Sequence, residues 1–303
     1  MLSSHGEGSE PRLVTRSPAA FRSAVFLAGD WMVFEREVHG RPLEVAVFGD
    51  DWATPLTEFT DLAASIVSAE REFFSDFERP YYLISLLPIG ARRSGGVSMG
   101  GTGLTDSFAL FLQPGSALDG RPSSGMSVPW LLAHEMFHDW NGHAIELAQP
   151  ERLGYWFSEG FTDFYARRIL RRMGFLSLGD YAASWNDRFG EYAANPARNE
   201  PAARIEAAFW SDPNVGSLPY QRGDLVALLV DHRIREASAG ARSLDELGGL
   251  ASAAGTTASQ LDGPWPRLLA DVRSVGQHFT VGPQQMHTAG RVLLGQDPGD
   301  PVF

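Results

Sequence analysis

The order of the hydrophobic patterns along the chain constrains its fold more than any other sequence feature. Short apolar runs typical of β-strands come first, at 24–34, 43–48, 81–87 and 107–113, with one helical pattern among them at 56–77. From Val128 onward the spacing is helical, at 129–141, 155–173, 179–193, 202–210, 220–237 and 264–276. Strands followed by helices predict an α+β fold, in which a sheet-containing lobe precedes a mostly α-helical lobe.

These patterns also predict where the parts of the chain begin and end. We expect a loose N-terminal segment over 1–20, a sheet-containing lobe over 21–125, a helical lobe over 126–280 and a polar C-terminal tail over 281–303. Ligand sites often lie between such lobes, so an active site is expected between them.

Composition excludes several classes of site and of function. The 303 residues carry a formal net charge of −12, which argues against a general nucleic-acid binder with a basic face. All 25 basic residues are arginine, so the lysine of a phosphate-binding P-loop is missing. The chain has no cysteine, so it forms no disulfide and offers a metal no thiolate. A metal site in this chain therefore contains no cysteine ligand.

The chain carries no sign of export or membrane insertion. Its start, MLSSHGEGSE, is polar and lacks the apolar core of a signal peptide. No apolar run approaches the roughly 18 residues of a membrane span, so we expect none. The expected location is cytoplasmic if Met1 is the natural start, and periplasmic or secreted if the chain comes from an exported precursor. The sequence does not indicate the oligomeric state.

One stretch of the first predicted helix of the second lobe carries metal-binding chemistry. LLAHEMFHDWNG, residues 131–142, contains His134 and His138 four residues apart, with Glu135 beside the first. Residues four apart share one face of a helix, so both imidazoles can reach one ion. Glu135 is rotated by about 100°, where a base acting on zinc-bound water belongs. A chance HExxH in a chain of this composition has odds on the order of one in a hundred.

A catalytic zinc ion needs a third protein ligand and an open position for water. His143 is one place away from the third histidine of the pattern HExxHxxGxxH, and we interpret it as structural or surface. Glu159 is the better candidate, because it lies among aromatic residues in YWFSEGFTDFYA, where a lone carboxylate is costly to bury. Asp163, four residues on, could hold the outer N–H of a ligand histidine.

Three stretches together resemble the glycyl aminopeptidase family of zinc metallopeptidases. They are HEMFHDWN from His134, WFSEGFT from Trp156 and PYQRG from Pro219, similar to the family's HExxHxWN, WxxEGFT and YxKG. The family is related to the aminopeptidase N and leukotriene A4 hydrolase group, and the resemblance implies a thermolysin-like metallopeptidase domain. Arg222 stands where the family usually has lysine, which keeps the charge.

The resemblance implies a role for each of these residues. His134, His138 and Glu159 would bind one zinc ion. Glu135 would be the general base and then the proton carrier, and Tyr220 would donate its hydroxyl to the oxyanion. The implied reaction is zinc-dependent hydrolysis of a peptide substrate.

The glycine-rich stretch 90–106, which we expect to be a loop, departs from the family pattern. The family has G-G-x-E there, and its relatives use the glutamate to hold the substrate's free amino group. This chain has Gly100, Gly101 and then Gly103 in place of the glutamate. We expect Gly100 and Gly101 to contact substrate, while Gly103 argues against aminopeptidase specificity and leaves an endopeptidase open. The resemblance also implies that strand 107–113 is an edge that pairs with the substrate backbone.

Two other functions remain open on the sequence. One is a zinc-bearing binding or scaffold protein without turnover. The other is a serine hydrolase using Ser98, which lies in a G-x-S-x-G match at 96–100. That motif needs a strand directly before it and a helix directly after it, and the sequence predicts neither. The residue preference and the biological substrate are not indicated.

Overall fold

The computed structural model describes residues 2–5, 15, 18–79, 81–90, 99–104, 106–119, 127–144, 147 and 150–246. The predicted helix 264–276, the predicted tail 281–303 and Ser98 lie outside these residues. The chain forms two compact units. The first comprises Met1–His143 and Ala166–Leu176, and the second comprises Ala144–Tyr165 and Ser177–Phe303. The predicted lobe boundaries stay a prediction.

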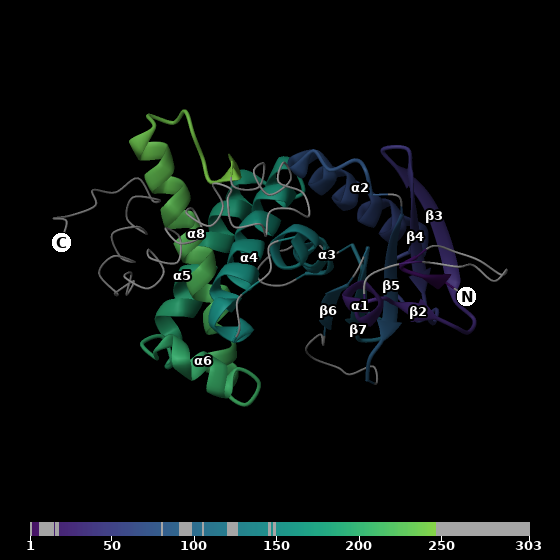
Figure 1. The fold of residues 1–303 in the computed structure, drawn as a ribbon, viewed down its shortest axis with the longest axis horizontal. Coiled ribbons are helices and arrows are strands. Elements are labelled where there is room, and N and C mark those ends of the chain that lie inside the picture. Colours follow the sequence, from purple (N-terminus) through teal and green to yellow (C-terminus); the bar gives the residue numbers. More distant parts are fainter. Residues whose placement is uncertain are drawn as a thin grey trace. The chain divides into compact units, whose positions relative to one another are not determined.

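The first unit is built on a mixed sheet of five strands in the order β3-β4-β5-β7-β6 (Figure 1). The strands are β3 (Met32–Val38), β4 (Arg41–Val47), β5 (Tyr82–Pro88), β6 (Met99–Leu104) and β7 (Ser107–Leu112). β5 runs parallel to β4 and β7, while the outer strands β3 and β6 are antiparallel to their neighbours. The β3–β4 turn falls at His39 and Gly40, as predicted, and both have positive φ, at 53° and 72°.

Two corrections concern the glycine-rich stretch. Part of it is not a loop, because Met99–Leu104 forms the strand β6. The strand that was expected to be an edge, β7, lies between β5 and β6. β6 occupies the edge instead, where its backbone needs only one ladder of hydrogen bonds and its glycines need no side-chain packing. Any pairing of a peptide with this edge would therefore use β6.

Helices cover the sheet of the first unit. α2 (Leu56–Phe74) buries the side of the helix that includes Phe59, Ile66 and Phe74, and it packs on α3 (Val128–Phe137). The second half of α4 (Tyr155–Arg172) belongs to this unit. It contacts α3 through Arg167, whose guanidinium lies 5.0 Å from the centre of the Trp130 ring.

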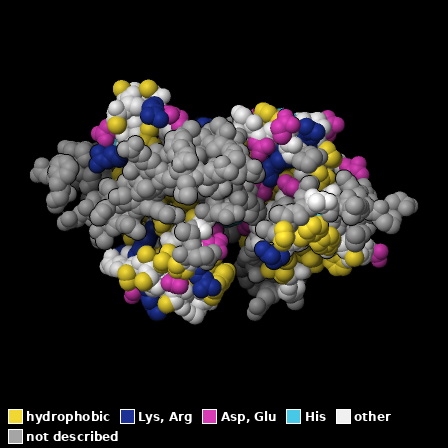
Figure 2. Space-filling model, viewed as in Figure 1, with side chains coloured by type: hydrophobic (Ala, Val, Ile, Leu, Met, Phe, Trp, Pro, Cys, Tyr) yellow, Lys and Arg dark blue, Asp and Glu magenta, His cyan; other side chains and the backbone are white. Residues whose placement is uncertain are grey.

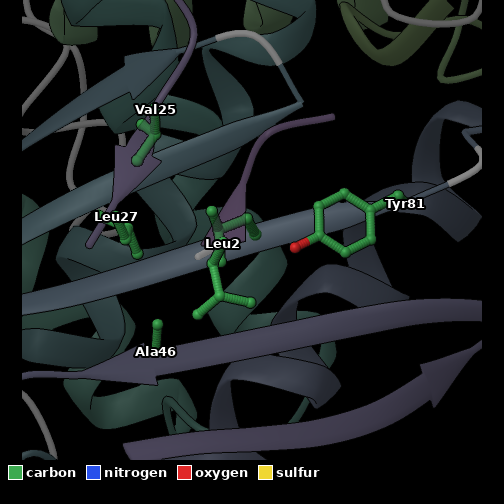
Figure 3. Packing of buried hydrophobic residues seen from close by; sticks show 6 residues of the cluster. Leu2, Val25, Leu27, Ala46 and Tyr81 are labelled. Carbon is green, nitrogen blue, oxygen red and sulfur yellow. The ribbon is translucent and has the colours of Figure 1, made fainter. Parts of the chain in front are cut away.

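Of the segment predicted to be loose, 1–20, the structure describes residues 2–5, 15 and 18–20, and the prediction for the whole segment stays a prediction. β1 (Leu2–Ser3) pairs with β2 (Phe26–Leu27), and α1 spans Pro18–Arg22. Leu2 is buried in a cluster with Val25, Leu27, Ala46 and Tyr81 (Figure 3). Apolar burial against the main sheet therefore holds the first residues in place, an effect that local sequence patterns do not reveal.

The second unit is helical. Besides the first half of α4 it contains a 3₁₀ turn (Glu151–Gly154), α5 (Leu178–Ala194), α6 (Ala202–Ala208), α7 (Pro213–Gly216) and α8 (Leu218–Ala237). Ser177 and Asp180 form a capping box at the start of α5. The predicted mixture of a sheet-containing N-terminal region and a helical part is confirmed. Among the described residues, no helix is both long enough and apolar enough to span a membrane.

Candidate metal centre

The helix that carries His134 and Glu135 is buried on every side. α3 begins at Val128, after Ser127, whose hydroxyl accepts a hydrogen bond from the backbone N–H of Trp130 at 3.4 Å. Pro129 sits in the first turn, where its missing N–H costs nothing. All ten residues of α3 are buried, and the exposed fraction is 7% for both His134 and Glu135. Burial on all sides restricts the rotamers of these two side chains.

A break in the helix fixes the ring of His138. Helical geometry is interrupted at Asn141 and at Gly142, whose φ of 151° favours glycine. The carbonyl of Asn141 thereby accepts a hydrogen bond from Nδ1–H of His138 at 3.1 Å. Because Nδ1 carries the proton, Nε2 keeps its lone pair, and it faces Nε2 of His134 at 3.1 Å. Two nitrogens bound to one tetrahedral zinc ion would be about 3.3 Å apart, so this pair fits such an ion.

Glu159 belongs to the same cluster. It lies near the start of α4, where rings of Trp156, Phe157 and Phe161 contact one another and the hydroxyl of Ser158 donates to Glu159 Oε1 at 3.4 Å. His134, His138 and Glu159 each offer one ligand atom, and these atoms all lie within 4.8 Å of one another. Among the described residues this is the group of three that could hold a metal ion. Two imidazoles and a carboxylate are a donor set that suits zinc.

The edge strand β6 passes directly over α3. A Cβ atom added at Gly101 would lie 2.5 Å from both Cδ and Oε1 of Glu135. One added at Gly103 would lie 3.0 Å from Cβ of His138. Gly100, whose side faces away, has open space instead. A side chain at 101 would force Glu135 or the β6 backbone to shift, and one at 103 would require the His138 side chain to give by a few tenths of an ångström.

One buried carboxyl that interacts electrostatically with His134 was not predicted from the sequence. Glu70 of α2 is fully buried, and both its oxygens lack a hydrogen-bond partner within the described residues. Burial raises the pKa of Glu70 well above its usual value; Asp139 raises it further and His134 opposes the rise. The sequence does indicate that Glu70 is buried. Glu70 lies three residues after Val67, four after Ile66 and four before Phe74, on the apolar face of its helix.

The remaining predicted site residues lie in the helical unit. Asp163 is buried and accepts a hydrogen bond from Nη2 of Arg188 at 2.7 Å, so its expected contact with a ligand histidine stays a prediction. Tyr220 is half-buried in the first turn of α8, and its expected role also stays a prediction. Arg222, in place of the family's lysine, donates to the carbonyl oxygens of Arg198 and Glu200 at 2.7 and 2.6 Å, which ties α8 to the segment before α6. The side chain of His143 lies outside the described part of the chain.

A protein-family model matches the central part of the chain, which contains the metal-binding cluster. The family model of the M61 glycyl aminopeptidases matches residues 128–212, which include His134, Glu135, His138 and Glu159. The predicted resemblance to the glycyl aminopeptidases is confirmed. No curated protein sequence matches the chain.

Solved structures of zinc peptidases share the fold. An aminopeptidase N family protein from Idiomarina loihiensis is 19% identical, with a TM-score of 0.58, over 80% of this chain and 46% of its own. An M1 zinc metallopeptidase from Deinococcus radiodurans is 15% identical, with a TM-score of 0.51, over 90% of this chain and 53% of its own. The chain thus spans about half the length of these structures, and at this identity the likeness concerns the fold alone.

Proposed function

We propose that this protein is a zinc metallopeptidase that hydrolyses peptide bonds at the His134, His138 and Glu159 cluster. The observation that carries the proposal is the convergence of these three ligand atoms, with the buried Glu135 directly after His134 on α3. When bound, a zinc ion supplies a water of lowered pKa and polarises the substrate carbonyl. The thermolysin-like arrangement of the domain is part of this proposal.

Glu135 serves as the general base and carries the proton to the leaving amine. It follows His134 directly on α3, and β6 passes so close to its side chain that a Cβ at position 101 would overlap it. A base that is confined in this way keeps its carboxylate in one place, which general base catalysis requires.

Tyr220 donates its hydroxyl to the oxyanion that forms on the substrate. Such a donor contributes most when negative charge develops in the transition state, so its loss should lower kcat more than it raises KM. Asp163, on α4, accepts a hydrogen bond from the outer N–H of a ligand histidine. We assign one zinc ion and a peptide substrate to the site.

Among the described side chains on the face drawn in Figure 2, acidic and arginine residues are interspersed and form no continuous basic patch. This distribution agrees with a peptide substrate rather than a nucleic acid.

The kind of peptidase depends on β6. Gly103 offers no carboxylate to a substrate amino group, which favours an endopeptidase over an aminopeptidase. Gly100 and Gly101 present backbone groups of the edge strand β6, which a peptide backbone could pair with.

The proposal is tested with purified protein whose zinc content is measured, offered a broad peptide library with free and blocked N-termini. Cleavage of blocked peptides identifies an endopeptidase, and cleavage of free N-termini alone identifies an aminopeptidase. Glu135→Gln should abolish hydrolysis while zinc stays bound. A wild-type protein with stoichiometric zinc that cleaves no member of the library would refute the proposal and favour a zinc-bearing scaffold. Loss of hydrolysis in Ser98→Ala would instead favour a serine hydrolase.

A further inference from the structure

An arginine of α5 joins the two helices that carry Glu159 and Tyr220. Arg188 donates from Nη2 to Oδ2 of Asp163 at 2.7 Å and from Nε to Oδ2 of Asp224 at 2.8 Å. The side-chain exposed fraction is 15% for Arg188, 5% for Asp163 and 0% for Asp224. Burial alone would lower the pKa of Arg188, but the nearby carboxylates outweigh it and raise the pKa. The guanidinium therefore stays charged between two buried carboxylates.

The two carboxylates occupy equivalent places on their helices. Asp163 follows Glu159 by four residues on α4, and Asp224 follows Tyr220 by four residues on α8. Residues four apart lie on the same face of a helix, about 6 Å apart along its axis. Arg188 thus holds each helix one turn beyond a residue of the proposed active site.

The same two helices touch through glycines beside those residues. A Cβ added at Gly160, next to Glu159, would lie 2.5 Å from the carbonyl carbon of Gly223. One added at Gly223, three residues after Tyr220, would lie 2.8 Å from Cα of Gly160 and would overlap the carbonyl oxygen of Trp156. The backbones of α4 and α8 are therefore in direct contact here, and no intervening side chain can adjust their separation.

We propose that Arg188 is a positioning residue that fixes α4 against α8, so that Glu159 and Tyr220 keep a constant separation. This inference rests on the proposed peptidase function. The glycine contact sets how closely the helices approach, and the two ion pairs prevent them from sliding or rotating about that contact. Arginine suits the task because its planar fork binds two carboxylates in fixed directions, whereas lysine offers a point charge. Buried ion pairs of this kind add little to stability but can specify one arrangement.

The test measures zinc affinity and turnover separately in Arg188→Lys and Asp224→Asn. Arg188→Lys keeps a charge near both carboxylates and should weaken zinc binding about tenfold, the range typical of groups that support metal ligands.

Asp224→Asn leaves Arg188 paired with Asp163, so zinc affinity should stay within about twofold. With zinc saturated, kcat of Asp224→Asn should fall about tenfold and KM should stay unchanged, because the hydroxyl of Tyr220 acts on the transition state. Glu191→Gln is the matched control, since Glu191 pairs with Arg188 at 3.1 Å from the exposed side and should change neither quantity.

Double variants separate positioning from a general loss of structure. In a Tyr220→Phe background Asp224→Asn should lower kcat no further, and in a Glu159→Gln background Arg188→Lys should weaken zinc binding no further. Effects that multiply in both backgrounds would overturn the inference, as would wild-type zinc affinity in Arg188→Lys. A wild-type protein without peptidase activity would refute the proposed function alone, because the zinc measurements would still decide the role of Arg188.

Discussion

Replacing Gly101 by alanine should impair catalysis without removing the metal. The added Cβ would stand 2.5 Å from Cδ and Oε1 of Glu135, whereas carbon atoms in contact lie about 3.5 Å apart or more. Either the Glu135 carboxylate or the β6 backbone must therefore retreat by about 1 Å. A misplacement of about 1 Å in a reacting group costs on the order of 100-fold in rate, which corresponds to about 2.7 kcal/mol in the activation free energy.

The assay is kcat and KM on a peptide that the wild type cleaves, together with bound zinc per chain. We expect kcat of Gly101→Ala to fall about 100-fold with stoichiometric zinc retained, because no metal ligand is changed. Gly100→Ala is the matched control for kcat, since an added Cβ there meets no atom within 4 Å; its KM is not part of the comparison, because Gly100 is expected to contact substrate. The reasoning is refuted if both variants turn over within about twofold of each other, because Glu135 would then not need the room that Gly101 provides.

Two further changes test the packing of the molecule. Gly223→Ala should destabilise the fold by about 1–3 kcal/mol, because the added Cβ would overpack against Gly160. Gly190→Ala on α5 adds a Cβ that meets nothing within 4 Å, so it should stabilise the fold by up to about 1 kcal/mol. Urea unfolding measures both free energies. Glu70→Gln should flatten the pH dependence of stability. Because the folded pKa of Glu70 is raised, the folded chain holds a proton that the unfolded chain releases above about pH 4.3, and stability falls as the pH rises through the folded pKa. An unchanged slope in Glu70→Gln, compared with wild type at the same zinc occupancy, would contradict the burial of an unpaired carboxyl.

Long periodic patterns predicted the helices well. The helix predicted at 56–77 is α2, Leu56–Phe74, and the one predicted at 220–237 is α8, Leu218–Ala237. Such segments bury one continuous face, so the spacing of their apolar residues reports their structure directly. The end of α3 was less predictable, because the helix predicted to Asn141 changes geometry after Phe137, where the backbone turns to hold the His138 ring.

The strand β6 was missed for a physical reason. Its sequence, MGGTGL, has no alternation of apolar residues, and glycine is normally depleted in strands. Its structure comes from the hydrogen-bond ladder with β7 and from the close approach to α3, both of which are tertiary. Local propensity cannot report the contact with α3, which lies about 30 residues further along the sequence. The interaction of Glu70 with His134 was missed for the same reason, although the sequence places Glu70 on the apolar face of its helix.

The close approach of β6 to α3 gives a second physical reason for glycine, rather than glutamate, at position 103. A glutamate placed there would bring a Cβ to 3.0 Å from Cβ of His138, a proposed zinc ligand that is already held by the carbonyl of Asn141. Gly103→Glu should therefore weaken zinc binding about tenfold, by displacing that ring, and should not by itself create aminopeptidase activity. Thr102→Glu adds the same charge to the exposed face of β6 and should leave zinc affinity within about twofold, as measured by competition with a chelator. A Gly103→Glu protein that binds zinc as tightly as wild type and cleaves free N-termini would mean that β6 can yield, and that the glycine sets specificity alone.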